Sequence, residues 1–142
     1  MLEDVRRRCD AIEECYEFML AYAAQGLPGD EGSQSGGQLR EFLRRAIEAL
    51  AGLSAAYTAA TGGLQPANRY QAFLAVLDRD ARDSLAALEL VMAQPALSSQ
   101  LIDNLNASIH LRALLTDVFL IDEVLKAAAN AQAPTAGREV SS

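Results

Sequence analysis

The chain has 142 residues, 51% of them hydrophobic, a length and composition typical of one folded domain with a substantial core rather than a disordered chain. Its net charge of −7 argues against nucleic acid as a partner, because nucleic-acid binding needs a positively charged surface. The sequence has neither a run of about 18 apolar residues, which a membrane span needs, nor an apolar segment directly after its N-terminal arginines, so we expect a cytoplasmic protein with no membrane span and no secretory signal.

The first predicted helix runs from about residue 3 to residue 25. Apolar residues recur along it at intervals of four and three, the spacing of a helix-bundle seam: Val5, Cys9, Ile12, Tyr16, Met19 and Ala23. A second stripe joins this seam in the C-terminal half, so we expect that half to be buried nearly all round: Cys15, Phe18 and Tyr22.

The two cysteines of the chain, Cys9 and Cys15, both lie on this first helix. Residues six apart on an intact helix point in different directions and are about 9 Å apart along the axis, so they cannot form a disulfide with each other. We therefore expect two free thiols, as in a reducing compartment.

The segment 27–37, LPGDEGSQSGG, predicts a loop because it combines proline with several glycines and short polar residues. It acts either as a flexible linker or as a mobile loop over a pocket or partner site. No phosphate-binding pattern accompanies these glycines, since no Gly-Lys-Ser/Thr follows them. The second helix is predicted to begin near Gln38, with Ser35 as its N-cap.

Clean apolar seams mark the next two helices, which are predicted to end at the Thr61-Gly62-Gly63 segment and near Ala93. The seam of the second helix is Leu39, Leu43, Ala46, Leu50, Leu53, Tyr57 and Ala60. The third helix begins near Pro66, and its seam is Tyr70, Leu74, Leu77, Ala81, Leu85, Leu88 and Met92. The charged run 78–83 on this helix indicates a solvated face with weak ion pairs.

A fourth helix is predicted from a cap at Ser98 or Ser99 to about residue 129. Its apolar direction changes along its length, so the helix either kinks at 104–108 or serves different neighbours with its two halves. The prediction for the fold is an all-α, antiparallel up-down four-helix bundle over residues 1–130, followed by a flexible, disordered tail at 131–142.

Few residues of this chain indicate chemistry. A carboxylate-bridged di-iron site in a bundle needs two histidines, each three residues after a glutamate, whereas this chain has one histidine. We therefore predict no metal site and no cofactor. There is also no Gly-x-Ser-x-Gly nucleophile motif, so the sequence favours a protein that is not an enzyme.

The candidate binding residues are Cys15, Glu17, Tyr22, His110 and Asp117. Asp117 has apolar helical neighbours, so we expect it to be mostly buried, where it either pairs with a tyrosine or an arginine of a facing helix or has a binding role. A lone histidine on an apolar stripe, such as His110, is typical of an interior residue. Glu17 closes an acidic cluster next to the apolar end of the first helix.

The first and fourth helices carry more apolar surface than one bundle seam needs. Phe119 lies opposite the core stripe of its helix, and Phe18 belongs to the second stripe of the first helix. A surplus apolar patch usually marks an interface. The sequence therefore predicts a non-catalytic protein-binding module, regulatory, chaperone-like or assembly-accessory, that forms a homodimer through Phe18 and Phe119. The alternative is a small-molecule or cofactor-binding bundle with a pocket near Cys15, Tyr22, His110 and Asp117.

Overall fold

The computed structural model describes residues 1–131, which form five helices and no strand. The helices are α1 (Leu2–Ala23), α2 (Gln34–Ala60), α3 (Ala67–Met92), α4 (Ser99–Ala107) and α5 (His110–Ala131). The prediction of an all-helical fold is confirmed, with one helix more than expected. The predicted tail at 131–142 lies, beyond its first residue, outside the described residues.

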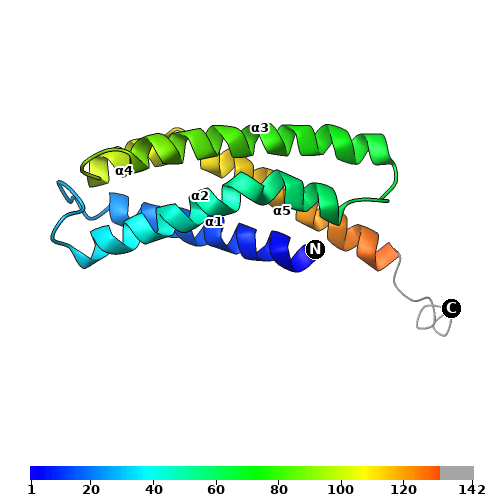
Figure 1. Ribbon diagram of the computed structural model, residues 1–142, viewed down its shortest axis with the longest axis horizontal. Helices are drawn as coiled ribbons and strands as arrows, with labels where there is room; N and C mark the ends of the chain where they lie inside the picture. Colours follow the sequence, from blue (N-terminus) through cyan, green and yellow to red (C-terminus); the bar gives the residue numbers. More distant parts are fainter. Residues whose placement is uncertain (132–142) are drawn as a thin grey trace.

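The longer helices lie lengthwise beside one another in an elongated molecule (Figure 1). α2 packs between α1 and α3, and α3 packs on α5. α1 is covered on its other side mainly by α4, whereas its contact with α5 is slight. The outer flanks of α5 therefore have little cover from α1. None of the helices in residues 1–131 has both the length and the apolar character needed to cross a membrane.

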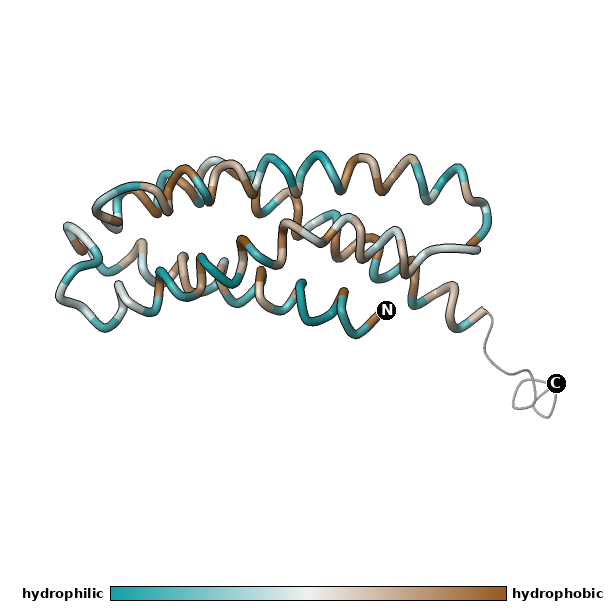
Figure 2. The backbone as a smooth tube through the Cα atoms, viewed as in Figure 1, coloured by the Kyte–Doolittle hydropathy of each residue, from teal (hydrophilic) through white to brown (hydrophobic). Residues whose placement is uncertain are grey.

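The predicted seams of the first three helices supply most of the core. Figure 2 shows hydrophobic positions recurring between hydrophilic ones along each helix. The largest fully buried side chains are Ile12, Met19, Tyr22, Leu39, Leu43, Leu53, Tyr57, Leu77, Leu88, Leu97, Ile102 and Leu114. Full burial of one such aliphatic side chain stabilises the fold by about 1.5–3 kcal/mol. The prediction that the C-terminal half of α1 is buried nearly all round is wrong, because Leu20 remains 48% exposed.

The prediction of a single fourth helix is wrong, because the helix is broken between α4 and α5. The break lies at Ile109, whose backbone has a φ of 63° in the left-handed region. Ser108 closes α4 by donating its hydroxyl to the carbonyl of Leu105 at 2.6 Å. The two halves then face different neighbours: α4 packs mainly on α1 and α5 on α3. Both alternatives for this region were therefore partly right, since a backbone break accompanies a change of partner.

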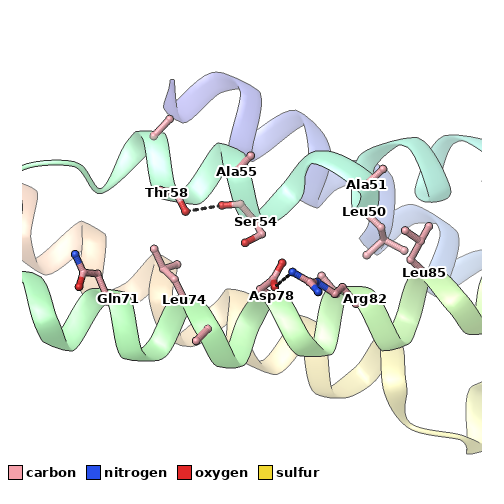
Figure 3. Close-up of a pocket in the computed structure, with 13 residues that line it drawn as sticks. Leu50, Ala51, Ser54, Ala55, Thr58, Gln71, Leu74, Asp78, Arg82 and Leu85 are labelled. Atoms are coloured by element: carbon pink, nitrogen blue, oxygen red, sulfur yellow. Dashed lines mark hydrogen bonds and ion pairs between the residues drawn. The ribbon is translucent and has the colours of Figure 1, made fainter.

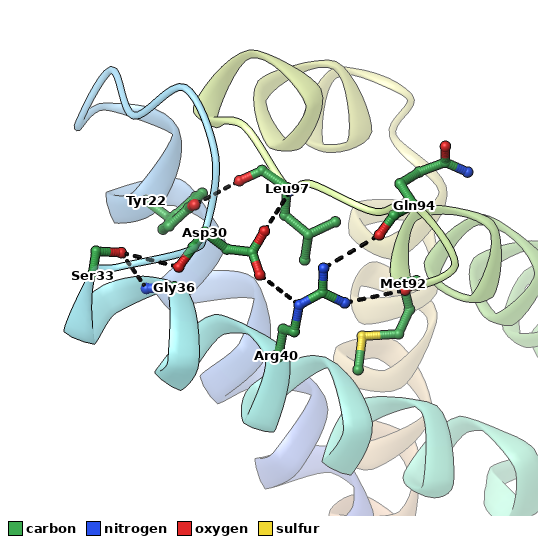
Figure 4. Close-up of polar contacts among 8 residues, drawn as sticks. All are labelled: Tyr22, Asp30, Ser33, Gly36, Arg40, Met92, Gln94 and Leu97. Atoms are coloured by element: carbon green, nitrogen blue, oxygen red, sulfur yellow. Dashed lines mark hydrogen bonds and ion pairs between the residues drawn. The ribbon is translucent and has the colours of Figure 1, made fainter.

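The loop between α1 and α2 is tied down by Asp30, which is only 8% exposed. Its carboxylate accepts the Nε–H of Arg40 at 2.5 Å and the backbone N–H of Leu97 at 2.7 Å (Figure 4). Arg40 also donates to the carbonyls of Met92 and Gln94, at 3.3 and 3.2 Å. The cluster joins the α1–α2 loop, α2 and the α3–α4 loop, so the glycine-rich segment is anchored rather than a free linker.

The start of α2 also differs from the prediction. Its N-cap is Ser33, not Ser35, and the Ser33 hydroxyl accepts the N–H of Gly36 at 2.9 Å. α2 therefore begins at Gln34, and the glycine pair lies inside it. A Cβ on Gly36 would overlap the backbone carbonyl of Asp30, so this position needs glycine because of tertiary packing.

Candidate interaction surface

The outer face of α5 exposes three large apolar side chains. Phe119 is 57% exposed, Leu120 is 54% exposed and Val124 is 39% exposed. The opposite face of the helix is buried, because it carries Leu111, Leu114, Leu115, Val118 and Ile121. Single exposed apolar residues are common on soluble proteins, but several on the outward side of one helix favour an interaction site. We call Phe119, Leu120 and Val124 the α5 patch.

A groove of about 350 Å³ flanks the α5 patch on the side of α1. Its lining, which we call the α1–α5 groove, is Glu13, Tyr16, Glu17, Arg112, Leu115, Thr116 and Phe119. Burial raises the pKa of Glu13, and the negative charges of Asp10, Glu17 and Asp122 raise it further. No hydrogen bond or ion pair of the Arg112 side chain occurs within residues 1–131. The groove therefore holds an arginine with no partner beside acidic residues.

A second groove, of about 310 Å³, flanks the α5 patch on the side of α3. Its lining, which we call the α3–α5 groove, is Pro66, Arg69, Tyr70, Phe73, Leu120, Ile121 and Val124. Two aromatic rings and three aliphatic side chains make this groove largely apolar. Such a surface accepts an apolar anchor from a partner, because it is concave and dehydrates easily.

Three polar side chains, one each from α1, α2 and α5, form a network close to the N-terminal part of α1. The fully buried Tyr57 donates its hydroxyl to Asp122 at 2.7 Å, and the same hydroxyl lies 3.4 Å from the sulfur of Cys9. Burial raises the pKa of the Tyr57 hydroxyl and raises that of the Cys9 thiol to about 11. A thiol with so high a pKa is a poor nucleophile at neutral pH, so we assign this network to structure.

Asp117 of α5 faces another acid, Asp80 of α3. The side chain of Asp117 is half-buried, and its Oδ2 atom is buried without a hydrogen-bond partner. Burial raises the pKa of Asp117 to about 7, together with a hydrogen bond to Asp80 and the like charge of that residue. The pair is therefore an acidic contact between two helices.

This geometry corrects two predictions about Asp117. The side chain is half-buried rather than mostly buried, and its partner is neither a tyrosine nor an arginine. Asp80 was hidden in the run 78–83, which the sequence indicated as a solvated face. The spacing within this run distinguishes Asp80 from its neighbours. Asp78 has an arginine four residues later, Arg82, and pairs with it at 2.8 Å. The residue four positions after Asp80 is instead Ser84, which is 1% exposed, so this side of α3 faces the interior.

The other predicted site residues lie in unlike surroundings. Cys15 and Tyr22 are fully buried, and Tyr22 donates its hydroxyl to the carbonyl of Leu97 at 2.6 Å. Burial raises the pKa of the Cys15 thiol to about 12. His110 is exposed, contrary to the expectation of an interior residue, because α5 begins there after the break at Ile109.

Of the two predicted interface residues, only one is largely exposed. The ring of Phe18 stacks on that of Phe42 with centroids 4.8 Å apart, so it contributes to the packing of α1 on α2. Phe119 instead lines the α1–α5 groove together with Glu17, an exposed candidate binding residue. The structure therefore brings together Glu17 and Phe119, whereas no hydrogen bond or ion pair within residues 1–131 joins any two of the five candidate binding residues.

A further groove, of about 820 Å³, lies between α2 and α3 (Figure 3). Most of its lining is alanine, serine and leucine, and its charged residues, Asp78 and Arg82, pair with each other at 2.8 Å. Thr58 donates its hydroxyl to the carbonyl of Ser54 at 3.0 Å. Because these side chains already have partners, this groove offers less for recognition than the two beside α5.

Within residues 1–131, no group of three His, Cys, Asp or Glu side chains converges as metal ligands. Comparisons with protein-family models, curated proteins and solved structures found no match to this chain.

Proposed function

We propose that this protein is a non-catalytic protein-binding module, regulatory, chaperone-like or assembly-accessory, that acts as a homodimer in the cytoplasm. In this proposal α1, α2 and α3 form an antiparallel up-down four-helix bundle in which α4 and α5 together take the place of the fourth helix. The binding surface is the α5 patch with the grooves on either side of it. The observation that supports the proposal is the exposure of Phe119, which is 57% exposed and lines the α1–α5 groove, and of Leu120, which is 54% exposed and lines the α3–α5 groove.

The energetic argument starts from the apolar area left in water. The side chains of the α5 patch are about half exposed. Covering each of them contributes roughly 1 kcal/mol, at about 25 cal/mol per Å². A two-fold interface uses the same patch on both copies and doubles that contribution. Aromatic residues such as Phe119 are enriched in the cores of protein interfaces.

The alternative, a small-molecule or cofactor site near Cys15, Tyr22, His110 and Asp117, has weaker support. Cys15 and Tyr22 are fully buried in the core, whereas His110 lies on the surface. Residues in such different surroundings do not define one cavity. The geometry therefore favours recognition of a protein surface over that of a small ligand.

Light scattering on purified protein at micromolar concentration tests the proposal. We expect the mass of a dimer for the natural chain and that of a monomer for Phe119→Glu, because a buried, unpaired carboxylate is costly at an interface. Leu90→Glu is the matched control: Leu90 is 67% exposed on α3 and lines none of the grooves described above. A monomer mass for the natural chain, or an unchanged dimer in Phe119→Glu, would contradict the proposed interface.

A further inference from the structure

The outer face of α5 also carries charges in a pattern that a second copy of the same helix complements. We infer that two copies pair through α5 in an antiparallel, two-fold arrangement, in which Arg112 of each copy faces Glu123 of the other. This inference rests on the proposed function, since it specifies how the homodimer forms. It assigns the Phe119 side of the α5 patch to a second copy of this chain, whereas Leu120 and Val124 line the α3–α5 groove.

A seam with coiled-coil spacing runs along the exposed side of α5. The seam residues, all exposed and separated by four, three, four and three positions, are Arg112, Thr116, Phe119, Glu123 and Lys126. This alternation is the spacing of a seam between two helices; Phe119 is its one apolar residue, so the charged residues decide the direction and register of pairing. The seam is distinct from the buried stripe that packs on α3, so α5 can serve both contacts at once.

The charges of the seam select a direction of pairing. A parallel two-fold pair would place Arg112 against the partner's Arg112 and Glu123 against the partner's Glu123, which is repulsive. An antiparallel pair centred between residues 117 and 118 places Arg112 against the partner's Glu123 twice. The two-fold axis requires both contacts to form together.

The same antiparallel register suits the middle of the seam. It places Phe119 against the partner's Thr116, a smaller residue whose hydroxyl is already bonded to the carbonyl of Arg112 at 2.9 Å. The methyl group of Thr116 is then free to contact the aromatic ring. A shift of one heptad in one direction would place Phe119 against the partner's Glu123, and a shift in the other would leave Glu123 without a seam partner, whereas the chosen register leaves only Lys126 outside the paired seam.

Both charged residues are available for this contact. The guanidinium of Arg112 has no ion pair within residues 1–131, although it lines the same groove as Glu13 and Glu17. The side chain of Glu123 is 76% exposed, and its ion pair to Lys126 is long, at 3.9 Å. The Glu123 carboxylate is therefore able to form an ion pair with an arginine of a second copy.

Charge reversal tests the pairing. We expect Arg112→Glu and Glu123→Arg each to weaken dimerisation about tenfold, because each variant turns two attractive contacts into two repulsive ones. The double variant Arg112→Glu with Glu123→Arg should restore the natural dissociation constant. A mixture of the two single variants should form a mixed dimer more tightly than either variant forms its own. Sedimentation at several concentrations and two salt levels measures these constants.

Each outcome separates the pairing from the dimer itself. If the natural chain is a monomer, or if Phe119→Glu leaves it dimeric, the proposed interface is wrong and the pairing falls with it. If Phe119→Glu abolishes the dimer but both single charge variants dimerise normally, the interface stands and the Arg112–Glu123 contact is wrong. Weakening that the double variant does not reverse would likewise overturn the register. The circular dichroism of each variant shows whether its helices are intact.

Discussion

Replacing Asp117 with asparagine tests the acidic contact between α3 and α5. The pKa of Asp117 is raised from 3.8 to about 7, first by burial and then by Asp80. A carboxyl whose pKa is higher in the folded chain binds its proton more tightly there than in the unfolded chain. The contribution of Asp117 to the free energy of unfolding therefore falls as the pH rises from 3.8 to about 7, and that contribution is level above this range.

The magnitude follows from the size of the shift. One pKa unit corresponds to about 1.4 kcal/mol, so a shift of this size sets an upper bound of roughly 4 kcal/mol. Because Asp117 is only partly buried, solvent screens the interaction with Asp80, and we expect about 1–2 kcal/mol. Asparagine has nearly the same shape as aspartate and no charge. Asp117→Asn should thus be more stable than the natural chain by that amount at pH 8 and equally stable near pH 4.

Urea unfolding followed by circular dichroism at several pH values measures this difference. The quantity of interest is the free energy of unfolding of the variant minus that of the natural chain, because other carboxylates then cancel. Asp83→Asn, an exposed position on α3, is the matched control and should show no such dependence. A loss of stability in Asp117→Asn at pH 8, or a difference that does not vary with pH, would refute the reasoning.

Three other predictions concern packing and the thiols. Gly36→Ala should destabilise the fold by about 2–4 kcal/mol in urea, because its Cβ meets the carbonyl of Asp30, whereas Gly37→Ala, with open space around it, should stabilise the fold by up to about 1 kcal/mol. Arg40→Met should cost about 2–3 kcal/mol at neutral pH, since Asp30 would stay buried without its cation. Arg40 lowers the pKa of Asp30, so this cost should shrink as the pH falls through the Asp30 pKa; an equal cost at pH 3 would argue against it. Both cysteine thiols should react slowly with a disulfide reagent at pH 8 and rapidly in urea, because burial raises their pKa values to about 11 and about 12; fast reaction of the folded chain would contradict their burial.

The apolar spacing of the sequence determined the first three helices and most of the core. Seam positions such as Leu43, Leu53 and Leu77 are fully buried, as their intervals of three and four predicted. The exposure of Phe119 followed from the same geometry, because it lies opposite the buried stripe of its helix. These features depend on local periodicity, which a sequence displays directly.

Tertiary structure alone decided which polar residues meet. The partner of Asp117 is Asp80, from a helix whose charged run resembles an ordinary solvated face. The anchoring of the glycine-rich loop depends on Asp30, whose partners Arg40 and Leu97 lie ten and 67 positions further along the chain. Helical periodicity fixes where a side chain points on its own helix, but not which helix lies opposite or in which register. The break at Ile109 has the same origin, because the change of packing partner from α1 to α3 selects a backbone that local preference disfavours.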